Sequence, residues 1–335
     1  MNIYPQPLQL PCCTAFNLRN PTSSISSSGT RLLTRNPYPH SLLLSPFPHL
    51  SSPNANTKRR RVVSLAATSL ELPLLPFVVN EVLVPSESKT LHLYEARYLS
   101  LLEESLMRKK KLFVHFVLDP ILVNDSSTEP SFAARYGCLV CIENVERLDV
   151  GALVSIRGVG RVKLVAFLQA KHNCLELYLS GLHYVCAFVQ AEPYLQGIVV
   201  PEHDKVPDSP SRLSSKVIEV KEALSNLNSL EIKLKAPKEA LLQTSTANSL
   251  VWAEKEPFID CDEAFIPSLP ERVSFVGLQP VSGSTQSELQ KLQNKKLRAM
   301  ELKDTLQRLD DSLELIKENI SMVAAKLAIQ SLETK

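Results

Sequence analysis

Glycine, cysteine and tryptophan are scarce in this chain of 335 residues, which contains nine, seven and one of them respectively. None of the glycines begins a GxxxxGK[ST] loop, so the sequence predicts no phosphate-binding P-loop. The cysteines are too few and too widely spread for a disulfide framework. No run reaches 18 consecutive apolar residues, so we expect no membrane-spanning helix and no integral membrane protein.

Acidic residues are absent from the first 70 positions, although these positions carry seven basic residues. Residues 1–66 are also rich in serine and proline, a composition typical of a disordered organelle transit peptide. The prolines prevent a long amphipathic helix, so the sequence favours a chloroplast over a mitochondrion as the destination. A nuclear signal in the KRRR run at 58–61 is the other interpretation.

The rest of the chain contains 30 basic and 35 acidic residues and is therefore mildly acidic. A nucleic-acid partner requires a basic surface that neutralises phosphates, so this balance argues against one. Because 44% of all residues are hydrophobic, the chain can bury a full core.

The foldable part of the chain begins at residues 72–106. An apolar, β-rich run punctuated by prolines comes first, and a helical pattern follows in which Tyr94, Tyr98, Leu102 and Leu106 are four residues apart. This change of period predicts a strand followed by an amphipathic helix.

Two sets of letters in this stretch, LPLLPF at 72–77 and TLHLYEARY at 90–98, resemble the opening of the Lon protease N-terminal (substrate-binding) domain family. The matching positions, all of which we expect to be structural, are Leu72, Pro73, Leu74, Pro76, His92, Glu95, Arg97 and Tyr98, followed further along by Gly137, Gly158 and Arg161. Two positions depart from the pattern, because the family's proline after the glutamate is Ala96 here and its glycine after an earlier proline is Ser86.

The resemblance implies an α+β fold in which a PUA-like β-pseudo-barrel is followed by helices. It extends over about 72–189, and β-rich runs at 112–118, 136–148, 152–157, 162–169 and 175–184 fit the strands of such a barrel. The layout that we predict is a barrel at 71–190, a linker at 191–212, a helical and irregular region at 213–284, and a long terminal helix at 285–332.

The terminal helix is expected to carry a heptad seam, since 285–332 contains no proline or glycine and Thr285 with Glu288 fits a capping box. The seam could pack within the chain or associate with another molecule. We predict that its first half packs internally and that its second half forms a homodimer or binds another partner. The residues of this association seam are Leu306, Leu309, Leu313, Ile316, Ile320, Val323 and Leu327.

Chemical motifs are few. Cys138 and Cys141 form a lone CxxC whose members point to opposite faces of a strand, so we interpret both as structural and not as a zinc site. The acidic group at 260–263 does not have the spacing of a calcium loop and is expected to be solvated. His92 has no identifiable nucleophile as partner, so we predict no catalytic residue, no metal and no cofactor.

Three functions fit these features. The resemblance implies a non-catalytic protein-recognition module, an adaptor or chaperone-like factor whose partners are client polypeptides or a separate protease complex. Neither the P-loop nor the Ser-Lys dyad of a full Lon protease is found, so the chain is predicted to be a plant, plastid-targeted protein with the Lon domain alone. The alternatives are a stand-alone peptidase or accessory enzyme, and a coiled-coil scaffold.

Overall fold

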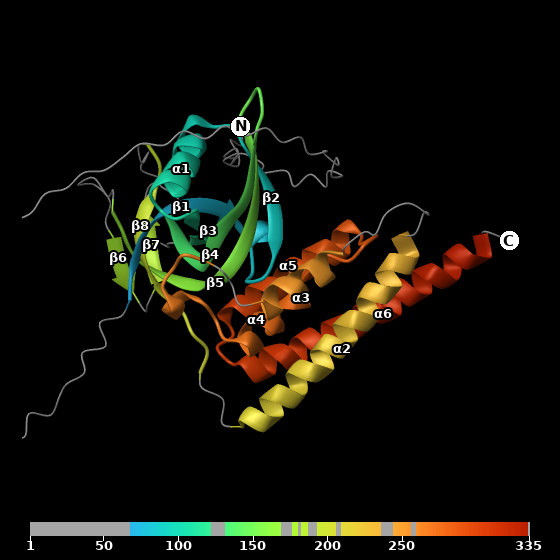
Figure 1. The fold of residues 1–335 in the computed structure, drawn as a ribbon. Helices are drawn as coiled ribbons and strands as arrows, with labels where there is room; N and C mark the ends of the chain where they lie inside the picture. The colour runs from blue at the N-terminus through green and yellow to red at the C-terminus, as the bar shows by residue number, and fades with distance from the viewer. Residues whose placement is uncertain are drawn as a thin grey trace, which may run out of the picture. The chain divides into compact units, whose positions relative to one another are not determined.

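The structure, a computed structural model, describes residues 68–121, 131–168, 176–179, 182–186, 193–205, 209–235, 244–255 and 259–333. The transit peptide predicted for residues 1–66 lies outside these ranges. Within these ranges, eight strands come first in chain order, with one α-helix among them, and five further α-helices follow (Figure 1).

The strands form one mixed sheet that closes on itself. Its order is β2-β5-β8-β1-β3-β4-β7-β6, and an additional pairing of β5 with β4 completes a ring through β8, β1 and β3. Only β1 and β3 are parallel among these described pairings. The strands are β1 (Leu70–Val78), β2 (Ser88–Leu93), β3 (Leu112–Ile121), β4 (Ser131–Arg147), β5 (Ala152–Phe167), β6 (Glu176–Leu179), β7 (Leu182–Cys186) and β8 (Gln196–Pro201).

Closure depends on the length of β4 and β5, each of which changes partner along its course. The first half of β5 pairs with β2 and its last part pairs with β8, while β4 runs along its other side. The runs 152–157 and 162–169, predicted as separate strands, are therefore parts of one strand. Gly158 permits a close approach there, because a Cβ atom would lie 2.3 Å from the carbonyl oxygen of Val84.

The predicted linker at 191–212 is wrong in part, because it contains β8. This strand pairs with β1 through Leu70–Pro73 on one side and with the end of β5 on the other. Its Val199 is fully buried between them. The barrel therefore extends beyond residue 190, and the last pairing that closes it is made by a segment whose prolines and acidic residues suggested a loop.

The helices are α1 (Ala96–Met107), α2 (Pro210–Lys235), α3 (Ser245–Glu254), α4 (Leu269–Val276), α5 (Gln286–Glu301) and α6 (Thr305–Glu333), with short 3₁₀ turns η1 (Val79–Glu81) and η2 (Glu263–Phe265). The apolar face of α1 packs into the barrel through Leu101 and Leu102, which join Leu75 and Phe77 of β1. The long helices α2 and α6 pack along each other, and α4 contacts both (Figure 1).

The single helix predicted for 285–332 is wrong, because it is divided between α5 and α6 at residues 302–304. The capping box of Thr285 and Glu288 is present at the start of α5, as predicted. The break has two physical causes. The carbonyl oxygen of Leu302 accepts hydrogen bonds from Arg161 and Arg308 at 2.8 and 2.6 Å. The carboxylate of Asp304 accepts from two backbone N–H groups in the first turn of α6.

Barrel and helices share their core. One cluster of buried side chains joins Val82, Val84, Val117 and Cys138 of the barrel region to Phe275 and other residues of α4, α5 and α6. A second cluster places Phe265, from the helical half, among strand residues such as Val162 and Val199. The two halves are therefore one packed unit. None of the described helices is long and apolar enough to cross a membrane.

Candidate functional site

The β4–β5 hairpin turn lies against the end of β2. Within the turn, the backbone N–H of Leu148 donates to the carbonyl oxygen of Gly151 at 3.1 Å, and Gly151 has a φ of 87°. A Cβ atom at this glycine would lie 2.2 Å from the carbonyl oxygen of Leu93, so only glycine fits. A ring nitrogen of His92 also lies 3.1 Å from the carbonyl oxygen of Val150. These contacts fix the turn on the strand.

Three apolar side chains are left in solvent at this junction. Tyr94 is 44% exposed, Leu148 39% and Val150 69%. The ring of Tyr94 lies 5.5 Å from that of His92, centroid to centroid, which ties it to the same side of the turn. We refer to Tyr94, Leu148 and Val150 as the tip patch. Exposed apolar groups gathered in one place are typical of a surface that contacts another molecule.

The tip patch adjoins an unpaired strand edge. β2 is the first strand of the sheet order and pairs with β5 on one side. On its other side, no described residue makes a backbone hydrogen bond to it. Such an edge presents N–H and C=O groups to which an extended peptide can pair. The side chain of Lys89, from β2, lies 4.0 Å from the carboxylate of Glu81, from η1.

The family-pattern residues are placed mainly in the architecture around this region. Leu72 and Leu74 are buried in β1, and Tyr98 is buried in α1. Glu95 occupies the N-cap position of α1 without capping it through its side chain, because its carboxylate pairs with Arg97 at 2.7 Å. The guanidinium of Arg97 in turn lies 4.6 Å from the centre of the Tyr98 ring.

The remaining pattern positions have packing roles. Pro73 and Pro76 pair in register with β8 and β3 respectively, and His92 is half-buried beneath the turn. A Cβ atom at Gly137 would lie 2.5 Å from the carbonyl oxygen of Val162, so the glycine allows β4 and β5 to approach closely. These positions belong to different strands and shape the barrel.

Arg161 lies in a buried network of charges that connects the barrel to the helices. Its guanidinium pairs with Glu271 of α4 at 2.9 Å and with Asp204, which also binds Arg308 and Thr305 of α6. Two cations face two carboxylates, so the network is formally neutral. Burial raises the pKa of Asp204, but the hydrogen bonds and charges of Arg308 and Arg161 outweigh it, and the pKa lies below its usual value. Burial and the charge of Asp204 raise the pKa of Glu271.

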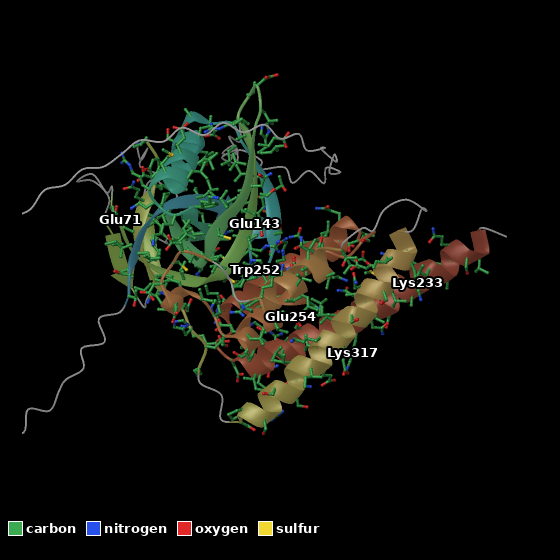
Figure 2. The ribbon with its side chains drawn as sticks, in the orientation of Figure 1. Glu71, Glu143, Lys233, Trp252, Glu254 and Lys317 are labelled. Atoms are coloured by element: carbon green, nitrogen blue, oxygen red, sulfur yellow. The ribbon has the colours of Figure 1, made fainter. Side chains whose placement is uncertain are left out.

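A second arginine makes the contact between β5 and α3. Arg157 pairs with Glu143 at 2.8 Å, donates to the side chain of Asn248 at 3.0 Å and lies 5.9 Å from the centre of the Trp252 ring. Figure 2 labels Glu143 and Trp252 at this junction. The pair with Glu143 lies within the barrel and the contacts with Asn248 and Trp252 reach α3, so we assign Arg157 to the packing of the two halves.

The cysteines and the acidic group at 260–263 offer no metal site in the part of the chain that the structure describes. Cys138 is buried and Cys141 half-buried, in different clusters, and burial raises the pKa of the Cys141 thiol to about 12. Asp262 caps η2, and Asp260 pairs with Lys110 at 2.6 Å. High thiol pKa values mean little thiolate near neutral pH and hence little reactivity.

The predicted association seam is placed largely inside the chain. Leu309, Leu313, Ile316 and Val323 are buried in a cluster with residues of α2 and α4, and Ile320 and Leu327 pack against it. Leu306 is half-buried. The face expected to bind a second copy is therefore covered by α2 of the same molecule, and a homodimer through α6 would have to use other residues.

Comparison with known families gives a match over most of the chain. The model of the ATP-dependent protease La (LON) substrate-binding domain matches residues 71–330. The chain belongs to the Lon substrate-binding domain family. The match includes the helices up to residue 330, so the family region is longer than the 72–189 predicted from the sequence, in agreement with the shared core of the two halves.

Among solved structures, the N-terminal domain of the Mycobacterium avium complex Lon protease is similar to this Lon-family chain. The two are 12% identical, the match covers 74% of this chain and 98% of the other, and the TM-score is 0.39. None of the curated proteins that were compared matches the chain.

The α+β Lon-type fold was predicted from the sequence and is confirmed, but the tip patch was not predicted. Tyr94 was assigned to the buried face of α1, whereas it precedes the helix and is exposed. The turn Leu148–Gly151 carried a usable signal for an exposed apolar surface. Its two apolar residues, Leu148 and Val150, lie in a hairpin turn, where they have no core to enter. Asp204, Glu271 and Arg308 gave no local signal, since their pairing depends on contacts between distant parts of the chain.

Proposed function

We propose that this chain is a protein-recognition module that binds unfolded or extended segments of client polypeptides, as an adaptor or chaperone-like factor for a separate protease. The observation that carries the proposal is the tip patch next to the unpaired edge of β2, in a member of a substrate-binding domain family. The edge supplies main-chain hydrogen bonds, and the patch supplies apolar contact for side chains of the client.

Charge supports the same kind of partner. Glu146 and Asp149 are exposed near Leu148, while two nearby pairs, Arg147 with Glu103 and Arg97 with Glu95, are each neutral. The surroundings of the patch are therefore slightly acidic, which suits polypeptides and opposes nucleic acids. The contacts are exposed and few, so binding is expected to be weak and reversible, as delivery to another protein requires.

Binding of a permanently unfolded client tests the proposal. The full chain is titrated into fluorescently labelled, reduced and carboxymethylated α-lactalbumin, and anisotropy is measured. We expect saturable binding that Val150→Asp weakens about tenfold, because it places a charge in the contact. Ile218→Asp is the matched control, since Ile218 is equally apolar and 58% exposed but lies on α2.

Two results would overturn the proposal. One is the absence of saturable binding, and the other is an equal loss of affinity in both variants. Cleavage of the client by the purified chain, detected by gel electrophoresis, would favour the stand-alone peptidase instead.

We also propose that residues 1–66 direct the chain to a chloroplast, on the basis of their acid-free, proline-rich composition. A fluorescent fusion of these residues should enter plastids of plant cells, and a fusion of residues 67–335 should stay outside them. Entry of the first fusion into mitochondria or nuclei would contradict this.

A further inference from the structure

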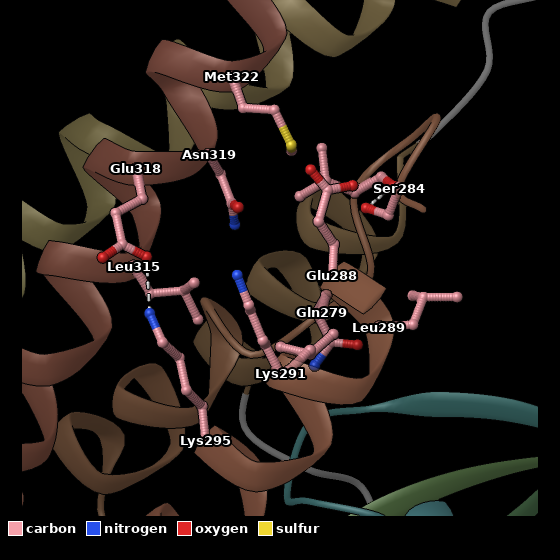
Figure 3. A pocket seen from close by; sticks show the side chains of 12 residues that line it. Gln279, Ser284, Glu288, Leu289, Lys291, Lys295, Leu315, Glu318, Asn319 and Met322 are labelled. Atoms are coloured by element: carbon pink, nitrogen blue, oxygen red, sulfur yellow. Dashed lines mark hydrogen bonds and ion pairs between the residues drawn. The ribbon is translucent and has the colours of Figure 1, made fainter. Parts of the chain in front are cut away.

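A groove lies between α5 and α6, beside the loop that follows α4. Its volume is about 250 Å³. The floor is apolar and consists of the buried residues Val281, Leu292 and Leu315. Half-buried Leu289 and Met322 form walls. Figure 3 shows the polar side chains of the two helices around the opening.

The charged groups that line the groove are paired, with one exception. Lys295 and Glu318 form an ion pair across the groove at 2.6 Å. The carboxylate of Glu288 accepts hydrogen bonds from the backbone N–H and hydroxyl of Thr285, at 2.6 and 3.0 Å, and lies 3.8 Å from Lys326. Lys291 is exposed and has no ion pair with any described residue, and its charge has only a minor part in lowering the pKa of Glu288.

The unpaired ammonium group is directed toward the cavity. Figure 3 shows the tip of Lys291, from α5, and the carboxamide of Asn319, from α6, pointing toward each other across the opening. Both groups can donate hydrogen bonds to one acceptor placed between them. With Lys326 beside Glu288, three lysines face two carboxylates around the groove, so its net charge is positive and favours an anionic ligand.

We propose that this groove binds the free C-terminus of a client polypeptide whose last residue is apolar. The terminal carboxylate would lie between Lys291 and Asn319, and the last side chain would rest on Leu292 and Leu315. A C-terminal residue carries its carboxylate and its side chain on the same carbon atom, so it meets both features of a cavity too small for a drug-sized ligand. An internal segment offers no such carboxylate.

This inference rests on the proposed function, because it names a feature by which clients would be recognised. It concerns a different surface, however, since none of the groove residues belongs to the tip patch or to β2. Binding of the unfolded client and binding of a short C-terminal peptide can therefore fail independently.

The test uses the full chain and two fluorescein-labelled peptides of identical sequence, four Gly-Ser repeats followed by Ala-Leu. One peptide ends in a free carboxylate and the other in an amide. Anisotropy titration should give about tenfold tighter binding for the free acid, the effect of one charge-assisted contact. Lys291→Gln should abolish the difference by lowering the affinity for the acid to that for the amide.

Two further variants and one competitor complete the design. Lys233→Gln removes an exposed lysine of α2 and should leave the tenfold difference intact. Met322→Trp fills the groove and should weaken binding of both peptides. Octanoate tests whether any aliphatic acid suffices, and we expect it to displace the free-acid peptide at least tenfold less effectively than the unlabelled peptide does.

The proposal is overturned if the acid and the amide bind equally, if Lys291→Gln preserves their difference, or if octanoate competes as well as the peptide. Should the unfolded client still bind in any of these cases, the proposed function stands and only the groove assignment fails. Loss of client binding together with intact discrimination between the two peptides would mean that the proposed function fails and the groove assignment stands.

Discussion

At the scale of the residue, Ser86 shows the cost of a departure from the family pattern. It stands where the family has glycine, and its φ of 68° lies in the left-handed region. Its hydroxyl is buried and donates to the carbonyl oxygen of Arg272 at 3.3 Å. Left-handed backbone costs a side-chain-bearing residue about 1–2 kcal/mol, and one hydrogen bond contributes about 1 kcal/mol. The serine therefore offsets strain with a contact.

Substitution separates the two effects. Ser86→Ala keeps the strain and loses the hydrogen bond, whereas Ser86→Gly loses both. We expect the glycine variant to be more stable than the alanine variant by about 1 kcal/mol and close to the natural chain. Guanidinium denaturation measures the free energies of unfolding, and an alanine variant as stable as the glycine variant would contradict the assignment of strain.

His115 makes stability depend on pH. It is completely buried, stacks on Phe77 with ring centroids 4.1 Å apart, and has a ring nitrogen 3.2 Å from the carbonyl oxygen of Glu81. Burial, with a smaller effect of the Lys89 charge, lowers the pKa of His115 to about 3. The unfolded chain binds a proton near pH 6.5 and the folded chain does not, so stability is complete above pH 6.5 and falls as the pH decreases toward 3.

Between pH 7 and pH 5 this group should therefore remove about 2 kcal/mol of stability. His115→Phe keeps an aromatic ring against Phe77 and cannot titrate, so its stability should fall by about 2 kcal/mol less over the same interval. His203→Gln, at an exposed position, is the control and should follow the natural chain. Parallel pH profiles for the natural chain and His115→Phe would show that His115 is not the group responsible.

Single residues were predictable from the sequence only where their role is local. The burial of the β1 residues Leu72 and Leu74 and of Tyr98 in α1 could be predicted from periodicity and the family pattern. The buried charges of Arg161, Asp204 and Arg308 do not, because their positions are more than 40 residues apart and charged residues are ordinarily exposed. The apolar residues of the tip patch are of the same types as core residues. They differ only in that no other part of the described chain covers them.

At the scale of the element, the division between α5 and α6 is set by tertiary contacts. Helix propensity favours continuation through 302–304, since no proline or glycine intervenes. The carbonyl oxygens of Met300 and Leu302 are instead bound by the buried guanidinium of Arg161, and Asp304 starts the next helix. The only sequence signal was that aspartate, a favoured N-cap residue. In the same way, tertiary contacts decide the conformation of β8. This short segment is a strand because β1 pairs with one side of it and β5 with the other.

The N-cap can be tested by substitution. Asp304→Ala leaves the backbone N–H groups of Leu306 and Gln307 without their acceptor, and we expect it to lower the free energy of unfolding by about 1 kcal/mol. Glu314→Ala, an exposed position within α6, should change it by less than about 0.5 kcal/mol. Equal effects in thermal denaturation would mean that Arg161 and Arg308 hold the break without help from the cap.

At the scale of the whole molecule, the packing of α6 changes the meaning of its heptad pattern. A seam of this kind predicts a partner helix but does not identify it. α2 supplies that partner within the chain, with Val220, Leu224 and Leu227 in the same buried cluster as Leu309 and Ile316. The sequence pattern was therefore informative about burial and uninformative about oligomeric state.

The shared core predicts that barrel and helices unfold together. Phe275 of α4 is fully buried, packs with Val82, Val84 and Cys138 of the barrel region, and lies 4.3 Å from the guanidinium of Arg308, measured to the ring centre. Phe275→Ala removes contacts from both halves, so it should cost about 3–5 kcal/mol. Ile218→Ala, at an exposed position of α2, is the control and should cost less than about 1 kcal/mol.

Two probes distinguish cooperative from separate unfolding. Trp252 is the only tryptophan of the chain and packs against the barrel cluster from α3, so its fluorescence reports the contact between the halves. Far-UV circular dichroism reports the secondary structure of both. We expect the two denaturation curves to coincide in the natural chain and to shift together in Phe275→Ala, since Phe275 contacts residues of both halves. A fluorescence transition at lower denaturant, with the dichroism unchanged, would mean that the barrel and the helices fold separately despite their common core.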